Sequence, residues 1–300
     1  MFVKVSNIDC LSDDGMKNIK SKSVAMILCD LPYAMTKNKW DIQLPMDKLW
    51  NEYNRIIKDN GVICLFANQP FTSQLIVANS KHFRYTLVWE KNKFSDFLNC
   101  KRKPLKIHED ILIFYKKQPT YNPQFTFSDP YVRWNKQASV DKQTNYGKIK
   151  ENKVINTDGK RYPTTVLKFN RVETPVHPTQ KPVELCEWLI NTYTNQGETV
   201  LDNCLGSGST AIACINTQRS IIGFEMENNY YNILLRRIID TVKDKSTSLY
   251  QTPENPDWEN QIKEGLYELT LMTPVQVVDL QQEVQEDVVP LDNLDTEQIV

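Results

Sequence analysis

The apolar positions of residues 1–117 alternate between the period of a strand and the period of a helix. Strand patterns cover residues 2–8, 23–29, 61–67, 85–90 and 110–115, and helical patterns cover residues 46–58 and 71–78. The run from Val24 to Cys29 is apolar throughout, which is typical of a strand that is covered on both faces. This alternation predicts a mostly parallel sheet with crossover helices.

The alternation stops at residue 118 and returns near residue 183. Residues 118–170 are rich in proline, asparagine, lysine and aromatic residues without a sustained period. Beyond them, helical patterns at 183–192, after Ser209 and at 229–242 alternate with strand patterns at 199–202 and 220–224. We therefore predict one α/β domain in two halves, residues 1–117 and 171–245. An irregular insertion, residues 118–170, separates the halves, and residues 246–300 form an acidic appendage.

Composition places the chain among ordinary globular proteins, with 40% hydrophobic and 24% charged residues. No apolar run is longer than Val24 to Cys29, which is far shorter than the roughly 18 residues of a membrane-spanning helix, so no membrane partner is expected. The first residues lack the apolar stretch of a secretory signal, and the seven cysteines are scattered singly. We expect an intracellular protein with free thiols, in the cytoplasm of a bacterial host or of a virus-infected cell, with the nucleus left open.

Charge divides the chain more sharply than its formal net charge of -1 suggests. Residues 246–300 hold 12 acidic residues and one basic residue, Lys263, so residues 1–245 carry a net charge of +10. A basic body of this size suits a polyanionic partner, because lysine and arginine displace counterions from phosphates. On charge alone, an evenly spread and solvated surface is the alternative.

The first candidate site is the strand at 199–202, which runs into the turn Gly206-Ser207-Gly208 and then into a helix. Glycines there let a ligand approach the backbone closely, and the start of the helix offers free N–H groups. Glu225 ends the next strand, where its carboxylate can accept hydrogen bonds from a ribose diol. Together these residues predict a nucleoside site, although a Gly-x-Gly taken alone also fits an ordinary helix-opening turn.

The second candidate site is the sequence Asp30-Leu31-Pro32-Tyr33, directly after the apolar strand. The lone pair of an adenine N6 is delocalised into the ring, so a nucleophilic nitrogen needs acceptors that draw its hydrogens out of the plane. Asp30 and the carbonyl of Leu31 or Pro32 supply two acceptors at the end of a strand. Tyr33 can stack on a base that has left its duplex. Taken alone, the four residues also fit a plain turn with a capping aspartate.

A third motif, His177-Pro-Thr-Gln-Lys-Pro182, by itself indicates only the start of a helix. The order of the three motifs resembles that of the β-class amino-group DNA methyltransferases. In that family a D-P-P-Y catalytic motif comes first, a target-recognition region follows, and the H-P-T-Q-K-P and F-x-G-x-G cofactor motifs come last. The resemblance covers residues 2–242 and is closest to small phage-encoded adenine methylases.

The resemblance implies a permuted Rossmann-like, S-adenosylmethionine-dependent methyltransferase sheet with helices on both faces. Residues 1–117 would be its catalytic half, 118–170 its target-recognition insertion and 171–245 its cofactor half. Two positions depart from the family pattern, because Leu31 replaces the first proline and Cys204 replaces phenylalanine. No metal is implied. The resemblance gives catalytic roles to Asp30, Pro32 and Tyr33, and it places S-adenosylmethionine among Asp9, His177, Thr179, Gln180, Lys181, Pro182, Asp202, Gly206, Gly208 and Glu225.

The acid of the second motif predicts the target base. In the family, aspartate at this position accompanies adenine N6 targets and serine accompanies cytosine N4, so Asp30 favours adenine. The sequence has no Pro-Cys pair, the nucleophile that a cytosine-C5 enzyme requires. We therefore expect a site-specific DNA methyltransferase that modifies a flipped adenine, as in restriction-modification systems. Cytosine N4 in DNA and adenine N6 in RNA stay open as alternative targets.

Basic residues interleaved with aromatic residues predict where double-stranded DNA binds. Residues 118–170 hold nine basic and four acidic residues among several tyrosines and a tryptophan, which suits groove and phosphate contacts. A solvated insertion is the alternative. The residues that we predict to contact DNA are Lys101, Arg102, Lys103, Arg133, Lys136 and Arg161.

Three rival functions fit the motifs less well. A nicotinamide dehydrogenase would also use a glycine turn, but the third glycine of G-x-G-x-x-G is absent and Asp30 to Tyr33 would have no role. The motif order and the basic insertion disfavour a methyltransferase of RNA or protein glutamine. An inactive DNA-binding protein would not need Asp30, Tyr33 and Glu225.

The acidic tail, residues 246–300, either folds over the basic body, contacts a second subunit in a homodimer, or extends into solvent.

Overall fold

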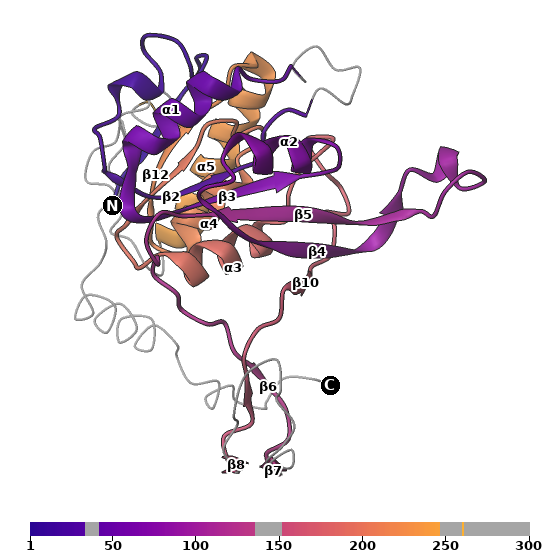
Figure 1. Cartoon of the computed structure of the whole chain (residues 1–300). Helices are drawn as coiled ribbons and strands as arrows, with labels where there is room; N and C mark the ends of the chain where they lie inside the picture. The colour runs from indigo at the N-terminus through magenta and orange to yellow at the C-terminus, as the bar shows by residue number, and fades with distance from the viewer. Residues whose placement is uncertain (34–41, 136–151, 247–259, 261–300) are drawn as a thin grey trace, which may run out of the picture.

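An eight-stranded sheet forms the centre of the computed structural model, which describes residues 1–33, 42–135, 152–246 and 260 (Figure 1). In spatial order the strands are β1 (Val3–Ser6), β12 (Ser220–Phe224), β11 (Thr199–Asp202), β2 (Val24–Cys29), β3 (Ile57–Ala67), β5 (Lys106–Phe114), β4 (Phe83–Ser95) and β10 (Val166–Lys168). Neighbouring strands are parallel from β1 to β3, β5 is antiparallel to both β3 and β4, and β10 is parallel to β4. The predicted, mostly parallel α/β sheet is therefore confirmed.

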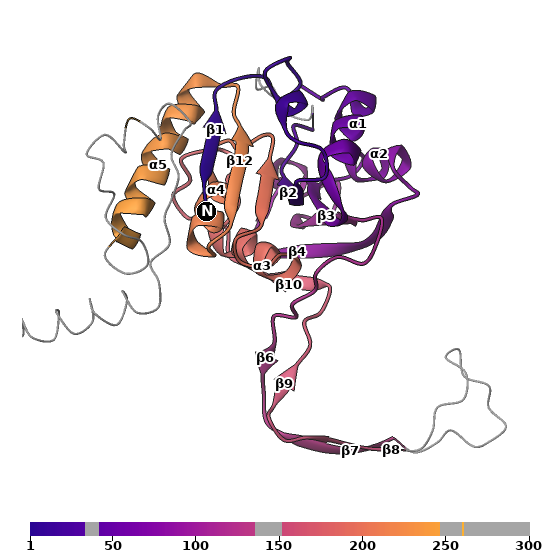
Figure 2. The same cartoon turned by 90° about the vertical axis from the view of Figure 1, so that its left-hand side faces the viewer.

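Helices cover both faces of the sheet, as the sequence predicts (Figure 2). One face packs against α1 (Met46–Ile56) and α2 (Phe71–Ala78), together with a short 3-10 turn at Met16–Asn18. The other face packs against α3 (Val183–Tyr193), α4 (Ser209–Asn216) and α5 (Asn228–Ser246). No helix in the described ranges is long and apolar enough to cross a membrane.

The central strand β2 is buried along its whole length, which explains its unbroken apolar sequence. Its side chains alternate between two hydrophobic cores. Met26 and Leu28 belong to the core beneath α3, α4 and α5, whereas Ile27 and Cys29 belong to the core beneath α1 and α2. Burial on both faces makes β2 the strand around which the sheet is organised.

The two halves of the chain pair at two places in the sheet, β1 with β12 and β2 with β11. Val200 lies opposite Met26 and Leu201 opposite Ile27, although more than 170 residues separate them in sequence. The chain leaves β11 toward α4 on one face and leaves β2 toward α1 on the other. Connections that diverge in this way leave a crevice at the carboxyl ends of the two strands, where α/β proteins bind ligands.

The segment predicted as irregular contains two β-ladders that form an arm projecting from the body (Figures 1 and 2). Strand β6 (Thr126–Phe127) pairs with β9 (Lys160–Arg161), and β7 (Tyr131–Asn135) pairs with β8 (Asn152–Asn156). Apolar side chains such as Phe127 and Val132 are exposed on the arm. Among the strand residues of the arm whose burial the structure describes, none is buried. Strands without a buried face have no reason to alternate apolar and polar residues, so no strand pattern marks them in the sequence. Strand β10, within the same segment, joins the main sheet.

Strands β4 and β5 are longer than the predicted ranges 85–90 and 110–115, and their extra residues form a hairpin beyond the sheet (Figure 1). A 3-10 turn at Phe97–Asn99 lies near its tip, and residues 101–104 form a loop after it. The acidic tail lies outside the described residues, except for Ser246 and Asn260, so the three readings of its role stay predictions.

We predict that Tyr53→Phe destabilises the fold by about 1–3 kcal/mol, because a buried acceptor loses its donor. The hydroxyl of Tyr53 in α1 donates to Oδ1 of Asn203, directly after β11, at 2.5 Å, and both residues are buried. Urea unfolding measures the change, with Tyr162→Phe on the exposed arm as the control. Equal stability of the two variants would contradict the prediction.

Candidate active site

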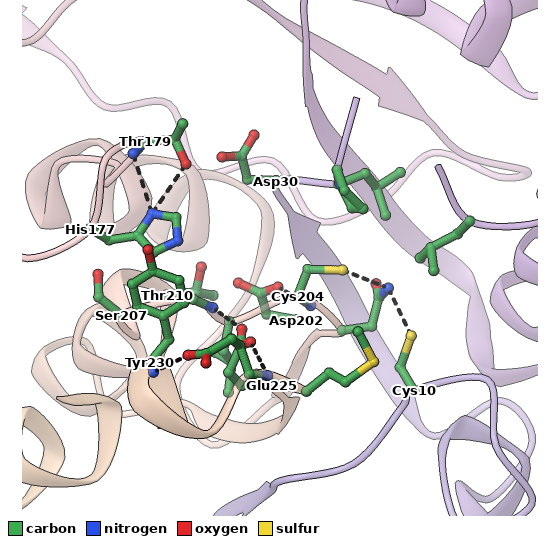
Figure 3. Close-up of a pocket in the computed structure, with 18 of the residues that line it drawn as sticks. Cys10, Asp30, His177, Thr179, Asp202, Cys204, Ser207, Thr210, Glu225 and Tyr230 are labelled. Carbon is green, nitrogen blue, oxygen red and sulfur yellow. Dashed lines mark hydrogen bonds between the residues drawn. The ribbon is translucent and has the colours of Figure 1, made fainter. Parts of the chain in front are cut away.

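A cavity of about 380 Å³ lies at the carboxyl ends of β1, β2, β11 and β12. Its size is within the usual range for ligand pockets, roughly 300–1,000 Å³. Segments that follow these strands supply most of its walls, and the segment before α3 supplies another (Figure 3). The sequence-predicted residues that line it are Asp9, Asp30, Pro32, Tyr33, His177, Thr179, Gln180, Lys181, Asp202, Gly206 and Glu225.

The other predicted residues lie elsewhere. Pro182 directly precedes α3 and Gly208 directly precedes α4, and neither is among the described residues that line the cavity. Lys136 lies outside the described residues. The remaining DNA candidates lie on the hairpin tip (Lys101, Arg102 and Lys103), on β7 (Arg133) and on β9 (Arg161).

The two glycines of the turn after β11, Gly206 and Gly208, have different structural roles. Both have positive φ, +52° for Gly206 and +87° for Gly208, a region that favours glycine. A Cβ on Gly208 would clash with Leu234 of α5, so this glycine allows α4 and α5 to pack closely. Gly206 lies at the cavity wall beside His177, so it is the glycine that leaves backbone open to a ligand.

Glu225, at the end of β12, is fixed by backbone donors on both sides. Its Oε2 accepts the N–H of Gly206 at 2.7 Å, and its Oε1 accepts the N–H of Glu227 at 2.8 Å (Figure 3). Burial raises the pKa of Glu225, and the two N–H donors oppose that rise. Each carboxylate oxygen retains capacity for a second hydrogen bond, so Glu225 can still accept from a ligand's hydroxyl groups.

Asp202 and Asn203, at the end of β11, form the floor of the cavity. Burial raises the pKa of Asp202 to about 6, and its Oδ1 accepts the N–H of Cys204 at 3.0 Å. The side-chain amide of Asn203 donates to the sulfurs of Cys10 and Cys204, each at 3.5 Å. Cys204, which replaces the phenylalanine of the family pattern, therefore belongs to a polar cluster around Asn203.

His177 is held as a neutral ring. Burial and, after it, the charge of Lys181 lower the pKa of His177 to about 4. Its Nδ1 accepts the backbone N–H of Thr179 at 3.2 Å, so the ring proton is on Nε2. The ring packs edge-on against Tyr230, with 4.1 Å between the centroids. The imidazole thus acts as a wall of the cavity and not as a cation.

Asp30, directly after β2, is held by two neighbours. The hydroxyl of Tyr33 donates to Oδ1 at 2.5 Å, and the ammonium of Lys181 forms an ion pair with Oδ2. Burial raises the pKa of Asp30, and the charge of Lys181 opposes the rise. The ring of Tyr33 contacts Phe71 at the start of α2, with centroids 5.1 Å apart. Asp30 is therefore an oriented acceptor beside an aromatic surface.

A second carboxylate, Glu109, interacts with Asp30 and Lys181 and was not among the predicted site residues. Glu109 in β5 forms an ion pair with Lys91 in β4, and its Oε2 lies 3.5 Å from Nζ of Lys181. Burial disfavours the Lys181 ammonium, but Asp30 and Glu109 outweigh it, so the pKa of Lys181 is raised. Glu109 belongs to none of the three sequence motifs, so no local pattern marked it as a functional residue. Lys181 therefore contacts Asp30 directly as well as lining the cavity.

The chain is similar in sequence to known DNA methyltransferases. The model of a DNA methylase family, N6_N4_Mtase, matches residues 24–236. The type II methyltransferase M.HindIII of Haemophilus influenzae is 24% identical, over 77% of this chain and 95% of its own length. The DNA adenine methyltransferase YhdJ of Escherichia coli is 28% identical, over 74% of this chain and 79% of its own length.

Solved structures share the fold. The M1.HpyAVI–SAM complex matches with a TM-score of 0.53 and 22% identity, covering 79% of this chain and all of that one. The PvuII DNA methyltransferase, described as cytosine-N4-specific, matches with a TM-score of 0.57 and 14% identity. That match covers 89% of this chain and 92% of the PvuII chain. At these identities the likeness establishes the arrangement of strands and helices.

We predict that Lys181→Met raises the pKa of Asp30 further, because the carboxylate loses the nearby positive charge that favours its ionised form. Titration of ¹³C-labelled aspartate carboxyl groups by NMR measures the midpoint, and Asp30→Asn identifies the signal. Lys17→Met removes an exposed lysine that pairs with exposed Asp13, neither of which lines the cavity, and it should leave the Asp30 midpoint unchanged. A Lys181→Met protein with an unchanged midpoint would show that the ion pair does not set this pKa.

Proposed function

The chain belongs to the DNA methylase family whose model matches residues 24–236, and we propose that it transfers a methyl group from S-adenosylmethionine to the N6 amino group of adenine in DNA. One observation carries this proposal. An oriented acid and aromatic ring, Asp30 and Tyr33, share one cavity with the glycine turn and Glu225. An amine pocket and a nucleoside pocket thus meet at the carboxyl ends of adjacent strands.

The cavity fits S-adenosylmethionine through the chemistry of its walls. Glu225 offers carboxylate oxygens to a ribose diol, and Gly206 leaves the backbone beside it open. Neutral His177 and Tyr230 offer flat apolar surface, and Thr179 and Gln180 offer polar groups. When bound, S-adenosylmethionine supplies an electrophilic methyl group on a positively charged sulfur.

On the acceptor side, the residues after β2 prepare an amine for attack. Asp30 uses one lone pair for Tyr33 and one for Lys181, which leaves capacity to accept an N6 hydrogen. The carbonyl of Leu31 or Pro32 accepts the second hydrogen, so the nitrogen moves toward tetrahedral geometry. Attack is direct, without a covalent enzyme intermediate. Asp30 then takes the proton that the methylated nitrogen loses, a role to which its raised pKa is suited.

Two observations favour adenine as the base. An aspartate at the position of Asp30 accompanies adenine targets in the β-class methyltransferases that the chain resembles. The relative YhdJ is described as a DNA adenine methyltransferase. The likeness to PvuII methyltransferase makes cytosine N4 the second candidate. The similarity to small phage-encoded adenine methylases remains a prediction from the motifs. Hydrolysis of DNA methylated in vitro, followed by chromatography of the nucleosides, distinguishes N6-methyladenine from N4-methylcytosine.

We propose that the arm of residues 118–170 reads the DNA site. Arg133 is exposed on β7 and is available to phosphates or base edges. Arg161, in contrast, makes contacts within the arm itself. Its guanidinium stacks over Tyr131 at 4.6 Å and donates to the carbonyl of Asp129 and to Oδ1 of Asn156. Arg161 therefore braces the arm, and any contact that it makes with DNA comes in addition to that role.

Asp30→Ala should lower the rate of methyl transfer on the order of 10²-fold or more, because the variant loses an acceptor that acts on the transition state. Calorimetry should still detect S-adenosylmethionine binding, because Glu225 and the glycine turn are intact. Single-turnover transfer of a tritiated methyl group to plasmid DNA measures the rate, with Asp13→Ala as an exposed control. A near-normal rate in Asp30→Ala would remove the assignment.

Tyr33→Ala should weaken transfer by about 1–3 kcal/mol, because the target base loses its stacking surface. Tyr33→Phe keeps the ring but loses the hydrogen bond to Asp30, so its rate should lie between those of Tyr33→Ala and the unmodified protein. The same single-turnover assay measures both. If Phe and Ala were equally slow, the hydroxyl and not the ring would be the functional group.

A further inference from the structure

The hairpin of β4 and β5 ends in a tip, residues 94–106, that points away from the body (Figure 1). Three large apolar side chains at this tip are more than half exposed: Phe94 at 54%, Phe97 at 65% and Leu98 at 83%. Apolar groups gathered at the end of a projecting element mark a surface that meets a partner.

Local hydrogen bonds give the tip a defined shape. Asp96 adopts a left-handed conformation with φ +68°, and its Oδ1 accepts from the side-chain amide of Asn99 at 2.5 Å. Lys103 forms an ion pair with the other carboxylate oxygen of Asp96. The 3-10 turn between them presents Phe97 and Leu98 on a braced loop. A braced loop pays little conformational entropy when it inserts into a partner.

The charge around the apolar tip identifies the partner as a polyanion. Residues 91–106 contain six basic residues and a single acidic residue, Asp96, which is already paired with Lys103. Lys93, Lys101 and Arg102 are exposed. Apolar side chains flanked by lysine and arginine suit duplex DNA, where apolar wedges enter the base stack and cations meet the phosphates.

The base of the hairpin is part of the candidate active site. Lys91 on β4 forms an ion pair with Glu109 on β5, and both belong to the ion-pair cluster that includes Lys181 and Asp30. Farther out, Lys106 bonds to the side chain of Asn68 in the segment that leads into α2. Because β4 and β3 both lie antiparallel to β5, β4 runs in the direction of β3, and its tip projects at the edge where the cavity lies.

The hairpin is long and narrow enough to enter a groove. From Lys91 to Asp96 an extended strand spans about 17 Å, at roughly 3.3 Å per residue. The major groove of B-DNA is about 8.5 Å deep and about 12 Å wide, and it admits a two-stranded ribbon. The tip can therefore touch the base stack while the base of the hairpin stays beside Asp30.

We propose that the tip of this hairpin is a DNA wedge, in which Phe97 and Leu98 enter the base stack beside the target and occupy the space that the flipped base vacates. The inference rests on the proposed function and adds to it the element that keeps the duplex open. The basic residues of the tip hold the neighbouring phosphates. An empty gap in the stack would otherwise favour return of the base, so the wedge raises the fraction of DNA with its target in the cavity.

The test compares two DNA substrates with the double variant Phe97→Ala/Leu98→Ala, whose altered side chains are exposed. Both substrates carry the sequence that the unmodified protein methylates in a plasmid. In one the target base is correctly paired, and in the other it is mismatched, so that unpairing costs less. The variant should methylate the paired duplex about tenfold or more slowly, and the mismatched duplex within about twofold of the unmodified protein. Val77→Ala, an equally exposed apolar position on α2, should leave both rates unchanged.

Each other outcome overturns the wedge. Equal rates for the variant and the unmodified protein on paired DNA would show that the tip does not act there. Equal losses on paired and mismatched DNA would make the tip a general DNA contact. If the unmodified protein methylated no DNA, the proposed function would fail and the wedge with it. The rates of the unmodified protein on both substrates identify this case separately from a failure of the wedge alone.

Discussion

The pairing of β11 with β2 is the constraint on which the site depends. These strands come from opposite halves of the chain, and their register places the ends of both at one edge of the sheet. Asp202 and Asp30 thereby line the same cavity, with Glu225 one strand farther on. Burial of β2 on both faces fixes that register, because a slip of one residue would exchange the side chains of the two cores. The hydrophobic sequence of β2 thus determines how the carboxylates around the cavity are positioned relative to one another.

Buried charge is the second constraint. Asp30, Lys181, Glu109 and Lys91 form a connected set of two carboxylates and two ammonium groups, all largely shielded from water. Removing one member leaves an uncompensated buried charge, which is far more costly than losing an exposed ion pair. The set also joins the acid at the end of β2 to the hairpin of β4 and β5. Asp30 is therefore linked through this set to the two strands that carry the hairpin tip.

Local features could be predicted from sequence and nonlocal ones could not. The apolar run of β2 and the turn after β11 each follow from neighbouring residues, and eleven of the residues predicted from motifs line one cavity. Glu109 could not be assigned, because its role comes from Lys91 and Lys181, which the fold brings to it. The arm and the outer hairpin were missed because strands with two exposed faces carry no periodic signal. Gly208 is the opposite case: the motif predicts a cofactor contact, whereas in the structure this glycine allows α4 and α5 to pack closely.

Calorimetric titration of the full chain with S-adenosylmethionine tests the central claim, that the crevice between the two halves is the cofactor site. The account predicts binding at one site per chain. It also predicts an affinity about tenfold weaker in Glu225→Gln, because a neutral amide replaces a charged acceptor, and no change in Glu173→Gln, whose side chain is exposed. Absence of binding to the unmodified protein, or equal affinity of Glu225→Gln, would contradict it.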